Sequence, residues 1–153
     1  MDTQKFLDYL QGMSWYHGQI VHREDIPPRE PVYANLETPL RPELQDSLEA
    51  LGITSLYSHQ AQAIDAVMHG ENVIVSTPAA SGKSLCYQIP ALVRDGVAIV
   101  VSPLIALMQD QIASLRQAGV RAAFINSTLD YETARERESG MVAGRFDLIY
   151  VAP

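Results

Sequence analysis

Cysteine is almost absent from this chain, and this shortage and others exclude several classes of protein. Cys86 is the only cysteine among the 153 residues, so no disulfide can form within the chain. No apolar run approaches the roughly 18 residues that a membrane-spanning helix requires. The first residues lack the basic start, apolar middle and small-residue cleavage site of a secretory signal. We therefore expect a soluble, cytoplasmic protein with no membrane partner.

Positive charge is scarce as well. The chain has 11 Lys and Arg residues against 18 Asp and Glu residues, which gives a net charge of −7. Because neutralisation of phosphates dominates affinity for nucleic acids, this balance excludes a broad basic binding face. Any contact with a nucleic acid must therefore be local, made by backbone amides or helix N-termini.

The N-terminal residues 1–42 are predicted to form a helix followed by a proline-rich strap. Asp2 can cap a short amphipathic helix that runs to about Leu10, and Gly12 would end it. Prolines and charged residues then crowd the chain, which favours an extended segment lying on a domain. A disordered leader has the same composition and remains an alternative. The prolines and the aromatic residues expected to pin the strap are Pro27, Pro28, Pro31, Pro39, Pro42, Trp15, Tyr16 and Tyr33.

Residues 43–153 alternate between strand-like and helix-like patterns and are expected to form one domain. Residues 43–51 and a helix capped by Ser58 come first. Strands are then expected at 73–76, 97–102, 121–125 and 147–151, with helices at 83–94, 104–118 and 131–142. Strands joined by helical crossovers must be parallel, and apolar runs such as 97–101 indicate that both sheet faces are covered. The fold class is therefore α/β, a three-layer α/β/α sandwich whose sheet is incomplete at the C-terminus.

Residues 77–84 read Thr-Pro-Ala-Ala-Ser-Gly-Lys-Ser, and they lie between an expected strand and an expected helix. In that context the pattern predicts a phosphate-binding loop. Backbone amides would curl around the phosphates, Lys83 would reach the β and γ oxygens, and Ser84 would ligate Mg²⁺. The candidate nucleotide-binding residues of the loop are Thr77, Pro78, Ala79, Ala80, Ser81, Gly82, Lys83 and Ser84.

Two positions of this loop depart from the usual pattern. Thr77 stands where the pattern begins with Gly, and Ala80 stands where many such loops have another Gly. Threonine is tolerable if the backbone there avoids positive φ, because only positive φ or close approach to a phosphate demands glycine. The alternative is a Gly-Lys-Ser turn that caps an ordinary helix.

Metal-ligating side chains are scattered rather than clustered. The histidines His17, His22, His59 and His69 lack the paired spacing of a zinc site, so each is expected to be a surface or locally bonded imidazole. Cys86 follows the phosphate-binding loop, where a buried thiol acts as a small hydrophobe. The expected cofactors are therefore ATP and the Mg²⁺ that accompanies it.

Further motifs flank the loop. Residues 56–60 read Leu-Tyr-Ser-His-Gln, residues 102–111 read Ser-Pro-Leu-Ile-Ala-Leu-Met-Gln-Asp-Gln, and residues 124–128 and 148–153 follow. This combination resembles the first RecA-like lobe of superfamily 2 DEAD/DEAH-type DNA helicases. Residues 1 to about 87 look like the MrfA-type repair helicases, and residues from about 83 to 153 look like the RecQ-type helicases.

The resemblance implies roles for residues outside the loop. In this superfamily a glutamine at the position of Gln60 reads the adenine edge, and Tyr57 is the candidate for a stacking ring. The alternative for Gln60 is a hydrogen bond to a helix terminus. The residues implied to hold a DNA strand, single or at a duplex junction, are Ser102, Pro103, Leu104, Asn126, Ser127 and Thr128.

The family's catalytic Asp-Glu pair does not occur in these residues, and the sequence ends where that pair is expected to follow. Our first hypothesis is the ATP-binding N-terminal portion of an ATP-dependent DNA helicase that neither hydrolyses ATP efficiently nor unwinds DNA alone. The second is a non-enzymatic, nucleotide-dependent binding or regulatory module that docks a partner lobe at the open sheet edge. A small-molecule kinase is disfavoured because no arginine-rich lid is apparent.

Overall fold

The computed structural model describes residues 2–27 and 30–152. Pro28 and Arg29 of the predicted strap, and the end residues Met1 and Pro153, lie outside the described residues. The chain divides into two units, Met1–Glu30 and Pro31–Pro153. Residues 31–42, which the sequence analysis assigns to the strap, belong to the larger unit. We describe each unit by itself.

The smaller unit contains helix α1, Thr3–Gln11. As predicted, Asp2 caps it: the Asp2 carboxylate accepts hydrogen bonds from the backbone N–H groups of Gln4 and Lys5 at 3.1 and 3.2 Å. The helix ends at Gly12, also as predicted. Trp15 and Tyr16 lie in this unit. The expected packing of these two rings against the larger unit therefore stays a prediction.

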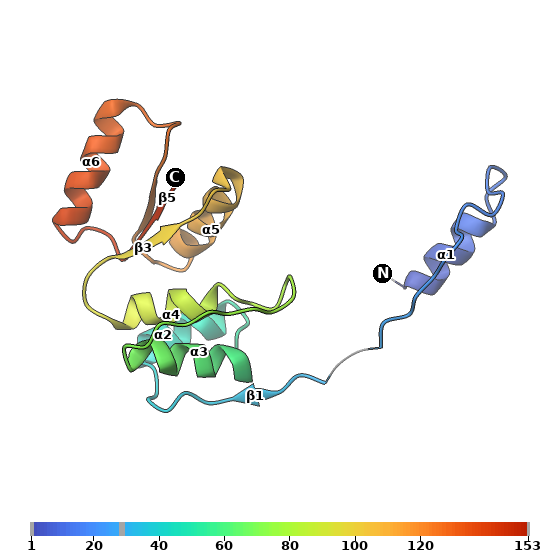
Figure 1. Ribbon diagram of the computed structural model, residues 1–153, viewed down its shortest axis with the longest axis horizontal. Coiled ribbons are helices and arrows are strands. Elements are labelled where there is room, and N and C mark those ends of the chain that lie inside the picture. The colour runs from blue at the N-terminus through green and yellow to red at the C-terminus, as the bar shows by residue number, and fades with distance from the viewer. Residues whose placement is uncertain (1, 28–29, 153) are drawn as a thin grey trace. The chain divides into compact units, whose positions relative to one another are not determined.

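The first half of the larger unit is mainly helical (Figure 1). Its elements are β1 (Tyr33–Ala34), α2 (Pro42–Ala50), β2 (Leu56–Tyr57), α3 (Ser58–Met68) and α4 (Leu85–Val93). The three helices α2, α3 and α4 share a core built around Leu48, Ile64 and Ile89. This core buries apolar area that none of the short helices could bury alone.

The antiparallel pair of β1 and β2 was not predicted. Two-residue strands are too short to show the alternation of apolar and polar residues that marks a strand. The start of α3 also differs from expectation: Ser58 is the first residue of the helix, and Tyr57 holds the N-cap position. The Gln60 side chain accepts a hydrogen bond from the Tyr57 N–H at 2.9 Å, so the amide of Gln60 takes over the capping that was assigned to Ser58.

The second half of the larger unit holds a parallel sheet. Its elements are β3 (Ala98–Val101), α5 (Ile105–Gln117), β4 (Ala122–Ile125), α6 (Tyr131–Val142) and β5 (Leu148–Val151). The strand order is β3-β5-β4, and β5 pairs in parallel with both neighbours. The predicted α/β fold with a parallel sheet is confirmed, and the element boundaries lie within two residues of those expected for these five elements.

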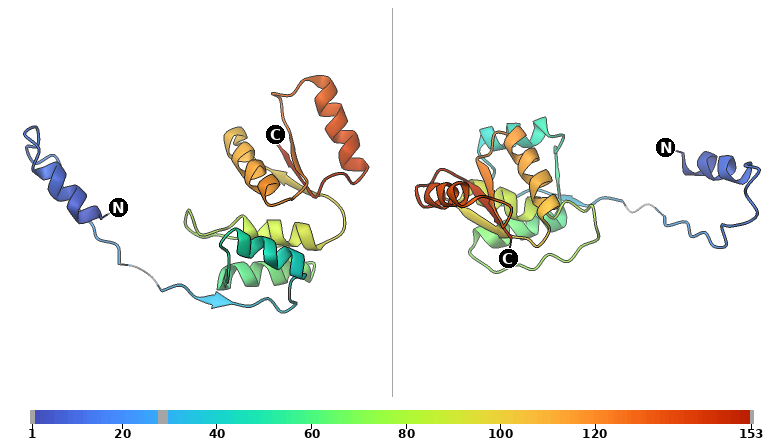
Figure 2. Two further views of the ribbon diagram at one scale, coloured as in Figure 1. Left: turned by 180° about the vertical axis from the view of Figure 1, so that it is seen from behind. Right: turned by 90° about the horizontal axis from the view of Figure 1, so that it is seen from above.

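Helices cover both faces of this sheet (Figure 2). On one face α5 packs Met108, Ile112 and Leu115 against Leu148 and Tyr150, and residues of α4 join this cluster. On the other face α6 lies beside Ile99, Ile125 and Val151. The three layers that the sequence predicts are thus present. Among the described residues, no helix is long and apolar enough to cross a bilayer.

Helix α4 is also joined to the sheet by polar contacts. The hydroxyl oxygens of Tyr87 and Tyr150 lie 3.1 Å apart, and the Gln88 amide donates to Gln111 of α5 at 3.0 Å. Burial raises the pKa of the Tyr150 hydroxyl, and the bond to Tyr87 raises it further, so this group stays a neutral hydrogen-bonding partner. These contacts fix the helix that follows the predicted phosphate-binding loop.

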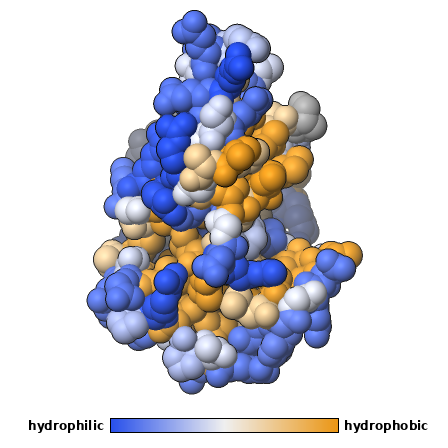
Figure 3. Space-filling model, turned by 90° about the vertical axis from the view of Figure 1, so that its left-hand side faces the viewer, coloured by the Kyte–Doolittle hydropathy of each residue, from blue (hydrophilic) through white to orange (hydrophobic). Residues whose placement is uncertain are grey.

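The strand predicted at residues 73–76 is wrong, because these residues form no strand. Ile74 is 96% exposed, although the run Val-Ile-Val at residues 73–75 is as apolar as the sequence of β5. A strand is stabilised by a hydrogen-bonded neighbour, and no ladder partner reaches this segment among the described residues. Figure 3 shows apolar surface exposed beside hydrophilic side chains on one side of the molecule.

Candidate functional site

The predicted phosphate-binding loop, residues 77–84, connects the unpaired segment to the first turn of α4. Within it Ala80 has φ +59° and Gly82 has φ +73°. Ala80 is the single non-glycine residue with positive φ among the described residues, and it stands where the sequence analysis noted a missing glycine. Thr77 has no positive φ, so its place at the start of the loop is sterically ordinary.

Lys83 folds back over its own loop. Its ammonium donates to the carbonyl oxygens of Thr77 at 2.8 Å and Pro78 at 2.6 Å. The hydroxyls of Thr77 and Ser81 lie 2.6 Å apart and close the loop from the other side. The Lys83 ammonium is therefore held by two neutral carbonyl groups. An anionic ligand can take their place, because its hydrogen bonds to the ammonium are charge-assisted and stronger.

The N-terminus of α3 contacts the loop through two consecutive side chains. The Gln60 amide Nε2 donates to the Gly82 carbonyl at 3.0 Å, and His59 Nε2 lies 3.1 Å from the Ser81 carbonyl. Gln60 is only 2% exposed. Gly82 is favoured by its positive φ, and a Cβ at this position would also have to displace the Gln60 amide from its present place. His59 was not among the predicted site residues, and the one available signal was its place beside Gln60.

Three rings stack beside this contact. Tyr33 of β1 lies opposite Tyr57 of β2, with ring centroids 5.4 Å apart and planes 11° from parallel. Tyr57 in turn stacks on His59, at 5.8 Å and 10°. Offset stacking of this kind is favourable for aromatic side chains. The predicted stacking residue Tyr57 thus lies between two other rings of the same chain.

The backbone N–H groups of the loop form a run of successive hydrogen-bond donors. None of the N–H groups of residues 79–84 donates a hydrogen bond to another described residue. These successive donors, together with the N-terminus of α4 that they lead into, form an arrangement that favours an anion. Four loop carbonyls, at residues 77, 78, 81 and 82, accept hydrogen bonds from side chains. The donors are Lys83, His59 and Gln60.

Ser84, the predicted magnesium ligand, lies at the start of α4. Its side chain is half-buried at the N-cap of α4, and its hydroxyl makes no hydrogen bond to another described residue. In the part of the chain that the structure describes, no cluster of three His, Cys, Asp or Glu residues offers an independent metal site. Burial raises the pKa of the neighbouring Cys86 thiol, which agrees with its expected role as a small hydrophobe.

The residues assigned to DNA contact follow the ends of two sheet strands. Ser102 comes after β3, and its hydroxyl accepts a bond from the Leu104 N–H at 3.4 Å. Asn126 comes after β4, and its Oδ1 accepts bonds from the Thr128 N–H at 3.0 Å and the Thr128 hydroxyl at 2.6 Å. Pro103, Leu104, Ser127 and Thr128 are exposed.

The amide nitrogen of Asn126 is an exception to good hydrogen bonding. Asn126 is only 9% exposed, and its Nδ2 is buried with no partner among the described residues. An unsatisfied buried donor of this kind costs roughly 1–3 kcal/mol. It is therefore a group for which an external acceptor would be favourable.

The predicted site residues thus form two groups. Contacts within the first join Tyr57 and Gln60 to the loop residues Thr77, Pro78, Ser81, Gly82 and Lys83. The second group gathers at the strand ends, where the Ser102 N–H bonds to Val151 and the Ala152 N–H bonds to Ile125 across adjacent strands. No hydrogen bond between described residues connects the two groups.

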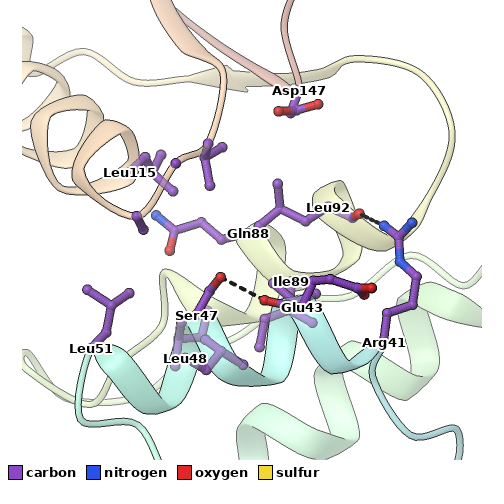
Figure 4. Close-up of a pocket in the computed structure, with 15 residues that line it drawn as sticks. Arg41, Glu43, Ser47, Leu48, Leu51, Gln88, Ile89, Leu92, Leu115 and Asp147 are labelled. Carbon is purple, nitrogen blue, oxygen red and sulfur yellow. Dashed lines mark hydrogen bonds between the residues drawn. The ribbon is translucent and has the colours of Figure 1, made fainter.

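A separate cavity of about 480 Å³ contains none of these residues (Figure 4). It lies between α2, α4 and the C-terminal end of α5, and Leu48, Ile89 and Leu115 line it. Arg41 at its edge donates to the Leu92 carbonyl at 2.9 Å. Asp147, also at the edge, precedes β5 and therefore lies at the opposite end of the strands from Ser102 and Asn126.

Comparison with known families gives a clear match. The model of the DEAD/DEAH box helicase family matches residues 57–153, which include the loop, both strand-end motifs and the Gln60 region.

Two curated relatives are bacterial RecQ helicases. The ATP-dependent DNA helicase RecQ of Haemophilus influenzae is 40% identical over 102 residues, which are 67% of this chain and 16% of that protein. The ATP-dependent DNA helicase RecQ of Bacillus subtilis is 44% identical over 103 residues, which are 67% of this chain and 17% of that protein. The chain therefore spans less than a fifth of the length of either relative.

Among solved structures, the fold is similar to the crystal structure of the DUF1998 helicase MrfA bound to DNA and AMPPNP. The TM-score is 0.75 at 24% identity, over 98% of this chain and 21% of that chain. A hypothetical ATP-dependent RNA helicase from Sulfolobus tokodaii matches 74% of this chain and 34% of its own, with a TM-score of 0.61 at 20% identity. The likeness to MrfA in fold extends over nearly the whole chain, beyond the residues 1–87 for which the sequence analysis expects it.

Proposed function

The chain belongs to the DEAD/DEAH box helicase family, and on this basis we propose that it is the ATP-binding N-terminal portion of a DNA helicase of the repair and recombination type. One observation carries the proposal: the N–H groups of residues 79–84, which have no acceptor among the described residues, lead directly into α4 in the same loop that holds the ammonium of Lys83. Donors and a cation in one short loop favour a polyphosphate ligand.

Binding of the phosphates would begin with an exchange of partners at Lys83. Its ammonium leaves the carbonyls of Thr77 and Pro78 and moves to phosphate oxygens, which are stronger acceptors because they are charged. The amides of residues 79–84 then surround the same phosphates. Ser84, whose hydroxyl has no other described partner, would ligate the Mg²⁺ that neutralises the phosphate charge.

The adenine would lie against the N-terminus of α3. Gln60 uses one amide hydrogen for Gly82 and one lone pair of its Oε1 for Tyr57, so a second hydrogen and a second lone pair remain. These suit the paired donor and acceptor of an adenine edge, and because Gln60 is only 2% exposed the base would reach them when the loop moves away from this side chain. Because Tyr57 already stacks on Tyr33 and His59, it would stack on the base by exchanging one of these two ring partners for adenine.

One DNA strand would be held at the ends of β3 and β4. The exposed Ser127, the Asn126 Nδ2 with no partner among the described residues, and the start of α5 after Ser102 are donors that suit phosphate oxygens. Thr128 would join them by giving up its present bonds to Asn126 Oδ1. With a net charge of −7, the protein has no general attraction for DNA, so this contact would depend on these local donors.

Hydrolysis and unwinding are not expected of these 153 residues alone. No Asp-Glu pair follows a strand within the sequence to orient the metal and activate water. Instead, the edge of β3, which has a strand neighbour on only one side among the described residues, is a surface where a further lobe would dock.

A nucleotide panel tests the proposal. Calorimetric titration of the chain should show magnesium-dependent binding of a non-hydrolysable ATP analogue, weaker binding of the GTP analogue, and loss of binding in Lys83→Ala. Gln60→Ala should reduce the preference for adenine without abolishing binding. Equal affinity of wild type and Lys83→Ala would refute the assignment of the loop. DNA-stimulated phosphate release that depends on Lys83 would refute the prediction of no turnover.

A further inference from the structure

His59 contacts the phosphate-binding loop at a point that controls the direction of a loop amide. Its Nε2 lies 3.1 Å from the Ser81 carbonyl oxygen. Because a carbonyl oxygen can only accept, Nε2 must carry a hydrogen and donate it. The half-buried imidazole is therefore a fixed donor to the loop rather than the surface or locally bonded histidine that the sequence analysis expects.

The geometry of the peptide group passes this contact on to the next residue. In a planar trans peptide the C=O of one residue and the N–H of the next point in opposite directions. Holding the Ser81 carbonyl against α3 therefore turns the Gly82 N–H away from α3. The bond from Gln60 to the Gly82 carbonyl does the same for the Lys83 N–H. Neither of these two N–H groups has an acceptor among the described residues.

The orientation of the imidazole is itself fixed. One face of the His59 ring stacks on Tyr57, and Tyr57 stacks on Tyr33, its partner in the β1–β2 pair. The backbone at this point is also held, because the Ser58 N–H donates to the Val32 carbonyl at 2.8 Å. The stack therefore connects the segment around Tyr33 to the phosphate-binding loop through a single ring nitrogen.

We propose that His59 is a positioning residue for phosphate binding: by donating to the Ser81 carbonyl, it directs the Gly82 N–H toward the site that the phosphates would occupy. This inference rests on the proposed binding of ATP by the loop. It assigns to His59 no contact with the nucleotide itself. Loss of the donor therefore weakens the binding of every ligand that carries the linked phosphates, whether or not that ligand has a base.

The test uses two probes, a non-hydrolysable ATP analogue and inorganic pyrophosphate, each with Mg²⁺. His59→Phe keeps a ring for stacking but has no donor, and it should weaken the binding of both probes by about fivefold, the size expected for one lost hydrogen bond. His59→Gln places an amide nitrogen at the distance of Nε2 and should restore most of the affinity. His59→Asn is polar but one bond shorter, so it should behave like His59→Phe.

The matched control is His69→Phe, at the far end of the same helix, which should bind both probes as the wild type does. If His59→Phe fails to fold, the comparison of His59→Gln with His59→Asn carries the test. Equal affinity of these two variants for pyrophosphate would overturn the inference, as would a loss confined to the ATP analogue. If the wild type binds neither probe, the proposed function falls and the inference falls with it.

Discussion

Two stretches of similar composition behave in opposite ways in this protein. Residues 148–151, Leu-Ile-Tyr-Val, form β5, and residues 73–75, Val-Ile-Val, form no strand. The central strand β5 has hydrogen-bonded neighbours on both sides, and Ile149 is completely buried. Ile74 is 96% exposed. The comparison shows that ladder partners and cover, rather than β-propensity alone, decide whether an apolar run becomes a strand.

The difference has a consequence for the phosphate-binding loop. Because no ladder holds the residues before it, the loop depends on side chains for its shape. His59 and Gln60 hold its second half, and Lys83 holds its first half. Among the described residues, the carbonyls of residues 77, 78, 81 and 82 accept hydrogen bonds from side chains and the N–H groups of residues 79–84 donate none, whereas both kinds of group are bonded in β5.

The largest expected effect comes from truncating the buried isoleucine of β5. Ile149→Ala removes a buried side chain between the sheet and α6, and it should cost roughly 2–5 kcal/mol of unfolding free energy. Ile74→Ala, its matched control, should change that free energy by less than about 0.5 kcal/mol, because the side chain already faces water. Urea denaturation measures both. Similar losses in the two variants would mean that residues 73–75 are packed like a strand.

A smaller effect is expected at the start of β4 and β5, where Arg121 and Asp147 form a hydrogen-bonded ion pair. Residues 73–75 have no such pair among the described residues. The Arg121 guanidinium, by hydrogen bonding to Asp147, lowers the pKa of that carboxyl. The stabilisation is therefore present above the unfolded pKa of about 3.9 and is lost as the pH falls through the lower folded pKa. Asp147→Asn should cost about 1 kcal/mol at pH 7.

Urea midpoints measured between pH 7 and pH 2.5 check this prediction. The wild type should lose its advantage over Asp147→Asn in the acid range below about pH 4. Asp95→Asn is the control, because Asp95 is exposed and has no ion pair among the described residues. A constant difference between wild type and Asp147→Asn down to pH 2.5 would show that the charge of Asp147 contributes nothing.

The smallest effect concerns the strained residue of the loop. Ala80 has φ +59°, a conformation that an L-residue adopts at a cost of about 1–2 kcal/mol and that glycine adopts freely. Ala80→Gly should therefore stabilise the protein by roughly 0.5–1 kcal/mol, after the greater flexibility of glycine in the unfolded chain is subtracted. Ala79→Gly, at an ordinary φ, should destabilise it slightly. Thermal unfolding distinguishes the two, and a destabilising Ala80→Gly would contradict the strained loop.

The parts of the fold that the sequence predicts well are those with a complete local pattern. The three strands of the sheet, the helices between them and the Asp2 cap all follow from periodicity and capping chemistry, and the structure contains them. The segment 73–76 could not be predicted correctly, because the pattern of a strand carries no information about whether a neighbour is present.

The candidate site shows the same limit. The residue types of the loop 77–84 predict phosphate binding from spacing alone, and the strain at Ala80 agrees with the departure from glycine noted in the sequence. The role of His59 could not be predicted, because a contact between residues 22 positions apart depends on how α3 packs against the loop. For Gln60, both the helix-terminus bond and a contact to the loop are present, so adenine recognition remains a proposal.

Amide hydrogen exchange, followed residue by residue with and without a magnesium-bound, non-hydrolysable ATP analogue, tests the central claim most directly. We predict slow exchange in β5 and fast exchange throughout residues 72–84 in the free protein. Addition of the analogue should slow exchange at residues 79–84, with the strongest protection at Gly82 and Lys83, and leave β5 unchanged. Saturating ligand with no protection in this loop would contradict the account.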